Sequence, residues 1–470
     1  MKNKNLLVII TLIISTLLPS PIFAQEDRGP TYIVQPGENL STIANKFGIN
    51  INDLIAINNI TDSNLISAGT ELMIPGLEGI SGVLSVKPIE LGETIPVILI
   101  KYDMGLDDLL KLNKLTSPSE VYVGTNLVLP NPILESTEEQ GNFFSLGIKS
   151  SILIESISKN LNHWSFSIDV QSTNTSFQVP SSIFEYKEET PGSSGSIFSP
   201  YIESVVLEPL PASQGHTSVL KVFISQPVNI SGTFDGHPLT FYLDESGAMQ
   251  YSLDSIHALR TPGLAQLIVD GTFESGESFH IDQMVLIESG GYVNETLTVE
   301  STLIDEELNK QEAAKVQEIL AETSAEKYWA QPFRYPVDGS LEDETIGFSS
   351  YFGNRRSYNN GEYSGFHGGL DFYVLLNTFN IYAPAPGVVA YAGPMDIRGF
   401  TTFIDHGQGV FSGYAHQSEI LVEEGQFVNT GDLIGLIGNT GRVTGPHLHW
   451  DIWVNGNQVD PFDWIYNQYP

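Results

Sequence analysis

The last hundred residues of this 470-residue chain hold histidines and an aspartate at spacings that suit a metal site. Side chains alternate between the two faces of an extended strand, so His447 and His449 should project from one side while Leu448 points into the core. Upstream, His367 and Asp371 add another imidazole and a carboxylate. Zinc accepts both ligand types, and the pattern therefore predicts a zinc site.

A catalytic zinc ion has three protein ligands and keeps its fourth position open for water. His367, Asp371 and His449 could fill that set. His416 and His447 would then remain beside the metal without binding it, where they could move protons or stabilise a tetrahedral intermediate. These residues favour a metal-dependent hydrolase.

This set of residues resembles the M23 family of lysostaphin-like zinc metallopeptidases, which cut peptide cross-links or bridges in bacterial peptidoglycan. The resemblance covers residues 336–464, and we place the domain at 333–470. Besides the histidines it includes the following motifs: Phe352-Gly353-Asn354-Arg355, the hairpin at 382–389, the glycine-punctuated strands at 424–435 and the turn Asn455-Gly456.

The resemblance implies an antiparallel β domain that binds one zinc ion. It assigns zinc binding to His367, Asp371 and His449, and catalysis to His416 and His447. Two departures from the family, the segment 372–377 and Gln417, leave the substrate preference open. We interpret another histidine, His406, as a structural turn residue. Arg355 and Tyr414 could contact substrate, but the sequence alone does not place them.

The composition limits the classes of partner. A chain of this length predicts three or four domains. It contains no cysteine, so disulfides and thiolate metal sites are excluded. The formal net charge of −35 argues against nucleic acid as a partner and against simple electrostatic adhesion to anionic wall polymers or lipids.

The N-terminus has the layout of a secretory signal. Lys2 and Lys4 precede an apolar run over 6–18, and cleavage after Ala24 would remove residues 1–24. We therefore expect a secreted, periplasmic or wall-associated protein with no membrane segment after cleavage. An uncleaved N-terminal anchor is the alternative.

Residues 31–75 show a short strand, two short helices and a closing strand, and they resemble a LysM module. That βααβ family binds N-acetylglucosamine-containing glycans, which implies a tether to peptidoglycan or chitin; a folded spacer is the alternative. Residues 83–130 form a weaker second copy, in which we expect Pro96 to interrupt the first helix.

Residues 143–300 show a β pattern typical of one or two immunoglobulin-like sandwiches. Its predicted strands are 164–170, 219–224, 239–243, 264–269 and 281–287, and its five isolated histidines (163, 216, 237, 257 and 280) are interpreted as non-ligands. Residues 304–330 predict an amphipathic helix that connects this region to the catalytic domain. Its position next to that domain is also compatible with self-inhibition.

These features predict a multidomain, mainly β, secreted zinc endopeptidase that is tethered to the wall and acts on peptidoglycan. A non-catalytic wall-binding scaffold that activates a separate amidase is the alternative, and the complete ligand set counts against it. A secreted protease acting on proteins or on a competitor's wall also remains open.

Overall fold

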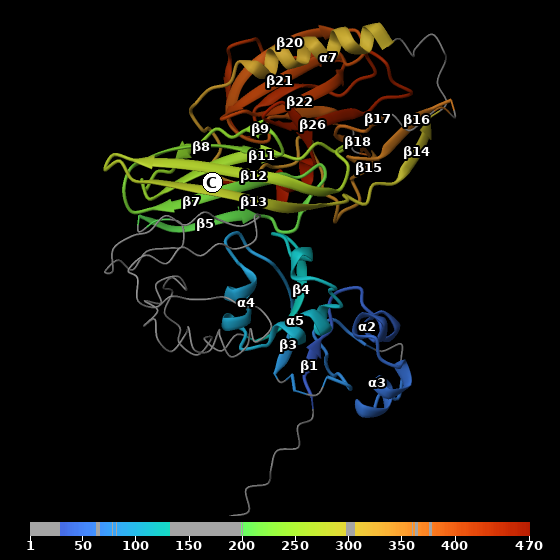
Figure 1. The fold of residues 1–470 in the computed structure, drawn as a ribbon. Coiled ribbons are helices and arrows are strands. Elements are labelled where there is room, and N and C mark those ends of the chain that lie inside the picture. Colours follow the sequence, from blue (N-terminus) through green and yellow to red (C-terminus); the bar gives the residue numbers. More distant parts are fainter. Residues whose placement is uncertain are drawn as a thin grey trace, which may run out of the picture. The chain divides into compact units, whose positions relative to one another are not determined.

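The computed structural model describes residues 29–62, 66–77, 79–80, 82–131, 199, 201–297, 306–359, 361, 365–375 and 378–470 (Figure 1). The predicted signal peptide and the predicted strand at 164–170 lie outside these residues. The chain divides into two compact units, one with most of the N-terminal strands and helices and one with the C-terminal β domains. No helix in the described ranges has the length and apolar character needed to cross a bilayer.

The N-terminal region repeats one strand–helix–helix–strand unit. The first copy consists of β1 (Thr31–Ile33), α2 (Leu40–Phe47), α3 (Ile51–Ile57) and β2 (Glu71–Met73). The second consists of β3 (Val83–Pro88), α4 (Ile95–Lys101), α5 (Leu106–Asn113), the 3₁₀ turn η1 (Pro118–Glu120) and β4 (Asn126–Pro130). Their strands form one sheet in the order β2-β1-β3-β4, which confirms the βααβ prediction.

An asparagine at the end of the second helix clamps the closing strand in both copies. Asn58 donates to Met73 O at 2.8 Å and accepts from Met73 N at 2.7 Å. Asn113 makes the same pair of bonds with Val128, at 3.0 and 2.6 Å. The second copy therefore keeps the backbone pairing of the first despite its weaker sequence pattern.

The expected interruption at Pro96 is wrong. Helix α4 begins at Ile95, so Pro96 lies in its first turn. A proline there removes no intrahelical hydrogen bond, because the first N–H groups of a helix have no partner within it.

The β domain after residue 200 consists of two sheets around an apolar core. One sheet has the order β10-β11-β7-β5 and the other β6-β13-β12-β8-β9. Their strands are β5 (Ile202–Glu208), β6 (Ala212–Ser213), β7 (Thr217–Ile224), β8 (Val228–Phe234), β9 (His237–Pro238), β10 (Tyr242–Leu243), β11 (Met249–Ser255), β12 (Gly263–Phe273) and β13 (Ser278–Glu288). The single strand expected at 239–243 is wrong, because β9 and β10 belong to different sheets and the chain crosses between them there.

The C-terminal domain is built on an eight-stranded sheet with the order β15-β18-β26-β22-β21-β20-β24 and with β27 paired to β26. Its strands are β15 (Ile346–Ser350), β18 (Leu370–Val374), β20 (Gly387–Met395), β21 (Gly399–Gly407), β22 (Val410–Gln417), β24 (Phe427–Val428), β26 (Leu448–Val454) and β27 (Asn457–Val459). A second sheet contains β19 (Asn380–Tyr382), β25 (Leu433–Leu436) and β23 (Glu419–Ile420), and α8 (Pro461–Tyr466) closes the domain.

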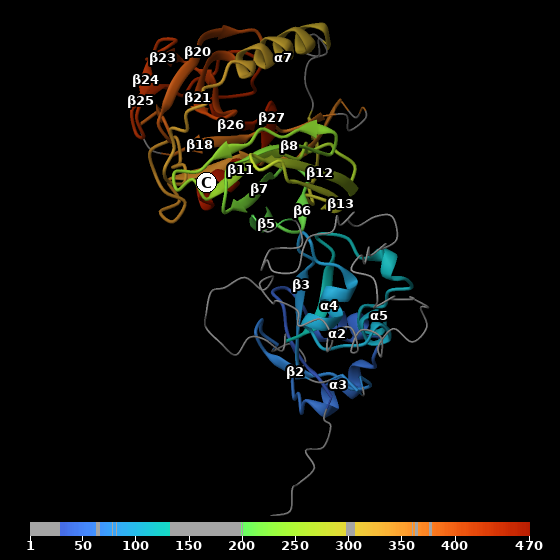
Figure 2. The same ribbon diagram turned by 60° about the vertical axis from the view of Figure 1, so that its left-hand side comes forward.

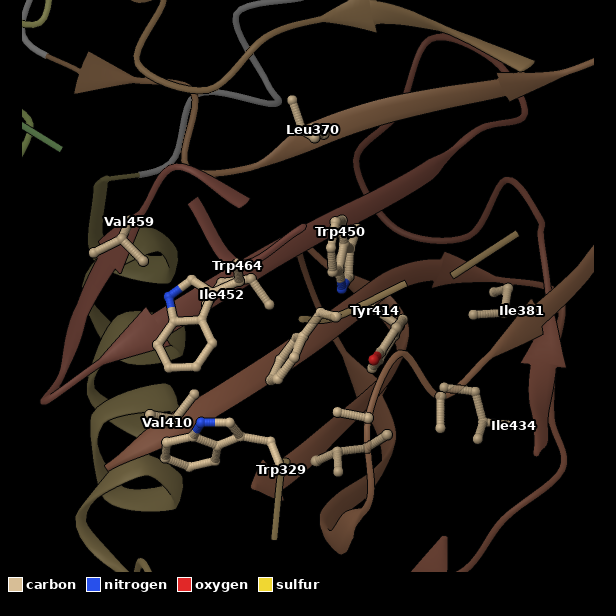
Figure 3. Packing of buried hydrophobic residues seen from close by; sticks show 14 of the residues in the cluster. Trp329, Leu370, Ile381, Val410, Tyr414, Ile434, Trp450, Ile452, Val459 and Trp464 are labelled. Atoms are coloured by element: carbon tan, nitrogen blue, oxygen red, sulfur yellow. The ribbon is translucent and has the colours of Figure 1, made fainter. Parts of the chain in front are cut away.

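A continuous core joins the two C-terminal β domains. Trp450, Ile452 and Trp464 pack in it, as Figure 3 shows, and it also includes Tyr251 and Leu253 of β11. The sheet β10-β11-β7-β5 is therefore covered on both faces, by its own sandwich and by the C-terminal domain.

Two further segments extend the C-terminal domain. Strand β14 (Asn294–Leu297) follows the sandwich and pairs in parallel with β16 (Arg355–Tyr358), which pairs with β17 (Gly365–Phe366). Helix α7 (Glu306–Ala321) lies along the main sheet (Figures 1 and 2). It ends well before Ala330, the expected boundary. After it, Ser324 N donates to Asp405 Oδ2 at 2.7 Å, which turns the chain onto the sheet.

Candidate metal centre

Three side chains on or next to two neighbouring strands converge on one point. Asp371 and His449 are directly opposite each other in the pairing of β18 with β26, and His367 lies just before β18. Asp371 Oδ1 lies 2.9 Å from His367 Nε2 and 2.8 Å from His449 Nδ1, and the two ring nitrogens are 3.1 Å apart. The sheet register thus joins ligands that are far apart in the sequence.

The donor set fits zinc. Zinc–nitrogen and zinc–oxygen distances of about 2.0–2.1 Å in a tetrahedron place the ligand atoms about 3.3 Å apart. The three observed atoms are slightly closer together than this. Among the residues that the structure describes, these three side chains form the one group of histidine, cysteine or acidic side chains able to hold a metal ion.

Two more histidines lie beside this group. The ring of His416 lies 4.9 Å from that of His447 and 6.1 Å from that of His449, measured between centroids. His447 Nε2 lies 3.7 Å from Asp371 Oδ1. Five side chains predicted from the sequence to form the site therefore occupy one place in the fold.

The Nδ1 atoms of both extra histidines face backbone carbonyls. His416 Nδ1 lies 3.0 Å from Thr440 O, and His447 Nδ1 lies 2.8 Å from Gly445 O. A carbonyl can only accept, so each Nδ1 carries a proton, and in the neutral form of such a ring Nε2 is an acceptor. Burial, together with the neighbouring His449 and His447, lowers the pKa of His416 to about 3, so this ring is neutral at pH 7.

Comparison with known proteins shows which families these residues match. Residues 365–461 match the family model of Peptidase family M23. They form an M23 peptidase domain. Residues 32–75 and 89–130 match the LysM domain, so both N-terminal copies are LysM modules.

Relatives of the M23 domain include two named enzymes. The peptidoglycan DD-endopeptidase ShyA of Vibrio cholerae is 40% identical over 127 residues, which are 27% of this chain and 28% of ShyA. The DD-carboxypeptidase/endopeptidase Mpg of Neisseria meningitidis is 40% identical over 95 residues, which are 20% of this chain and 22% of Mpg. The matched part thus spans about a quarter of each relative. A solved M23 peptidase from Pseudomonas aeruginosa is 28% identical, covers 55% of this chain and 96% of its own, and has a TM-score of 0.40.

Each of the three converging side chains in the M23 domain has an outer partner. Tyr351 O lies 3.0 Å from His367 Nδ1, Asp451 Oδ2 lies 3.4 Å from His449 Nε2, and Arg356 Nη2 lies 3.6 Å from Asp371 Oδ2. Such partners fix the tautomer and orientation of metal ligands.

Arg356 and Asp451 are functional candidates that the sequence analysis missed. Burial alone would raise the pKa of Asp371, but its interactions with His367 and His449 hold that pKa well below its ordinary value. Arg356 is itself held by Glu295 of β14, at 3.3 Å, so the segment after the sandwich reaches the site. The only sequence signal for Asp451 was its alternation with His449 along one strand.

The backbone around the site has two demanding positions. Between His367 and Asp371, a Cβ on Gly369 would lie 2.3 Å from Trp450 O, so β18 can approach β26 only with glycine there. His416 has a φ of +67°, which L-residues rarely adopt. Strained backbone of this kind tends to occur where function requires a particular side-chain direction.

The side chains of Tyr414, Gln417 and Arg355 make contacts within the fold. Tyr414 is fully buried, with its hydroxyl 2.7 Å from Ser412 Oγ, and Gln417 is buried and donates to Thr402 Oγ1 at 2.9 Å. Arg355 donates to Ala258 O at 2.6 Å and so bridges the M23 domain to the sandwich. Tyr414 is therefore no surface contact for substrate.

His406 belongs to strand β21 and not to a turn. It is fully buried, with Nδ1 2.7 Å from Pro386 O and Nε2 2.7 Å from Ser412 Oγ. Both nitrogens are thus engaged away from the metal group. Burial lowers the pKa of His406 from 6.5 to about 4.

This shift predicts a pH-dependent loss of stability. The pKa of His406 is lower in the folded state, so the unfolded chain takes up the proton first as pH falls from 6.5 toward 4. Between pH 7.5 and 4.5 this lowers the free energy of unfolding by about 2.5 kcal/mol. The test is urea unfolding followed by tryptophan fluorescence, with a chelator present. Over this pH range we expect the free energy of unfolding of His406→Gln to fall by about 2.5 kcal/mol less than that of the unaltered protein. Equal losses in the two proteins would show that His406 is not the group responsible.

Proposed function

We propose that this protein is a secreted, wall-tethered zinc metalloendopeptidase that hydrolyses peptide cross-links or bridges in peptidoglycan. The observation that carries the proposal is the convergence of His367, Asp371 and His449, with two further imidazoles beside them. The M23 and LysM family matches and the peptidoglycan endopeptidases among the relatives support it.

In this proposal His367 Nε2, Asp371 Oδ1 and His449 Nδ1 hold one zinc ion. Bound zinc supplies Lewis acidity toward a carbonyl and toward water. His416 and His447 are the catalytic residues. Their Nε2 atoms can accept a proton and return it to the leaving amine, because the Nδ1 protons are already donated to Thr440 O and Gly445 O.

The LysM modules are assigned to glycan binding in the wall. With a formal net charge of −35, general electrostatic attraction to anionic wall polymers is unfavourable, so attachment must come from specific contacts. Once one LysM copy is bound, the second copy is held close to the same wall, and this high effective concentration strengthens the attachment.

Purified sacculi provide the test. We expect the zinc-loaded full chain to release muropeptides that carry new amine ends, and a chelated sample to release none. Mass spectrometry of the products identifies the bond that is cut. If several wall chemotypes release nothing while the protein still binds the sacculi, the enzymatic proposal fails and a scaffold that activates a separate amidase is favoured.

A further inference from the structure

Helix α7 and the candidate zinc site share one face of the main sheet. Along β26, His449, Asp451 and Trp453 alternate with core residues, so these three side chains point to the same face. Trp453 packs with Val316 and Leu320 of α7, while His449 belongs to the metal group. Asp451 is the one strand position between them.

Glu312 of α7 is a buried acidic residue, with only 8% of its surface exposed. Its carboxylate accepts hydrogen bonds from Ile397 N at 2.6 Å and from Arg398 N at 3.1 Å. Both donors belong to the turn between β20 and β21. A buried carboxylate is costly unless it is bound in this way, so apolar docking of the helix does not by itself explain a glutamate here.

Arg398 connects this turn to His416 and to His449. Its carbonyl oxygen accepts a hydrogen bond from His416 N at 2.8 Å. Its Nη2 donates to Asp451 Oδ2 at 2.6 Å, and the same oxygen lies 3.4 Å from His449 Nε2. The turn therefore contacts the backbone of His416 and, through one carboxylate, the ring of His449.

The turn is packed too tightly to shift alone. Gly399 has a φ of +68°, and a Cβ on Gly441 would lie 2.4 Å from Gly399 N. Phe400 N donates to Thr440 Oγ1 at 2.9 Å, and Thr440 O faces His416 Nδ1. A displacement of the turn would therefore move the carbonyl that sets the tautomer of His416.

We propose that Glu312 is a positioning residue of the zinc site. By fixing the 397–399 turn it orients the zinc ligand His449 through Arg398 and Asp451, and it holds His416 through Arg398 O. This proposal rests on the proposed function. It assigns α7 a role within the catalytic unit, although the helix lies outside residues 365–461, which match the M23 family.

The test compares two substitutions on the same helix in the full chain. Glu312→Gln keeps the shape of the side chain but cannot accept both backbone N–H groups, whereas Val316→Ala weakens only apolar packing of α7. Zinc affinity is measured by competition with a chromogenic chelator, and kcat and KM with a soluble cross-linked muropeptide. We expect Glu312→Gln to bind zinc about 3- to 10-fold more weakly and to lose about 10-fold in kcat with little change in KM. Val316→Ala should leave all three values unchanged.

A double-mutant cycle checks the route through Arg398. Once Arg398→Met has removed the charged donor, Glu312→Gln should cause little further loss of zinc affinity, because the connection to Asp451 is already broken. Fully additive losses would overturn this route, and equal behaviour of Glu312→Gln and Val316→Ala would overturn the proposal. If the unaltered protein binds zinc but cuts no muropeptide, the proposed function fails, and the affinity comparison still decides the role of Glu312. A protein without zinc affinity would overturn both.

Discussion

Replacing His449 with alanine is expected to abolish zinc binding and hydrolysis together, whereas His416→Ala should abolish hydrolysis and leave zinc bound. His449 Nδ1 is one of three donor atoms at the point of convergence, so its loss removes a ligand. The ring of His416 lies beside this group without joining it, and loss of a general acid–base typically costs about 10²- to 10⁴-fold in rate. Elemental analysis of both purified variants and muropeptide release from sacculi provide the two measurements.

A matched control for these variants is His280→Ala. This exposed histidine pairs with Asp270 on the sandwich and should affect neither zinc content nor activity. Loss of zinc in His416→Ala would show that our assignment of the ligands is wrong. Full zinc content in His449→Ala would contradict it equally, because the remaining pair His367 and Asp371 cannot hold the ion tightly without a third ligand.

Replacing Trp464 with alanine is expected to lower the free energy of unfolding by about 3–5 kcal/mol, the usual cost of removing a large buried aromatic side chain. Trp464, which Figure 3 labels, is 1% exposed. Its ring centroid lies 4.4 Å from that of Tyr469 and 5.1 Å from that of Phe333. Its Nε1 also donates to Thr217 Oγ1 of the sandwich at 3.1 Å. Urea unfolding followed by intrinsic fluorescence measures the effect, because three other buried tryptophans (329, 450 and 453) remain in the C-terminal part of the chain.

A substitution on the sandwich side tests whether the two β domains unfold together. Leu253 of β11 is 1% exposed and packs in the same core as Trp464. We expect Leu253→Ala to lower the free energy of unfolding of the M23 domain, followed by tryptophan fluorescence, by about 2–5 kcal/mol. This effect is expected although no tryptophan is adjacent to Leu253 in the sequence. An unchanged transition would show that the domains are energetically independent despite the shared core.

The contacts between the sandwich and the M23 domain extend to the candidate metal site. His216 of the sandwich pairs with Asp463 at 2.9 Å, and Glu295 of β14 holds Arg356 beside Asp371. Burial alone would lower the pKa of His216, but its hydrogen bond with Asp463 raises it above its ordinary value. The M23 domain therefore depends on the preceding region for packing and for one contact next to the candidate metal group.

The sequence by itself determined the chemistry of the site and the order of the modules. His447 and His449 on one strand, with His367, Asp371 and His416 upstream, predicted the five side chains that the fold brings together. Alternating and helical periodicities predicted the LysM units and three of the nine described sandwich strands, β7, β12 and β13. These signals are local, since strand and helix periods are set by neighbouring residues.

Only the tertiary structure decided which distant groups support those residues. Glu312, Arg398, Glu295 and Arg356 have no periodicity or spacing that connects them to the histidines, and Pro96 appeared to break a helix that in fact begins one residue before it. Likewise the ends of α7 and the crossing at 239–241 depend on contacts with other elements. Hydrogen bonds between segments far apart in the chain depend on strand register and packing, which a single sequence does not encode in any local pattern.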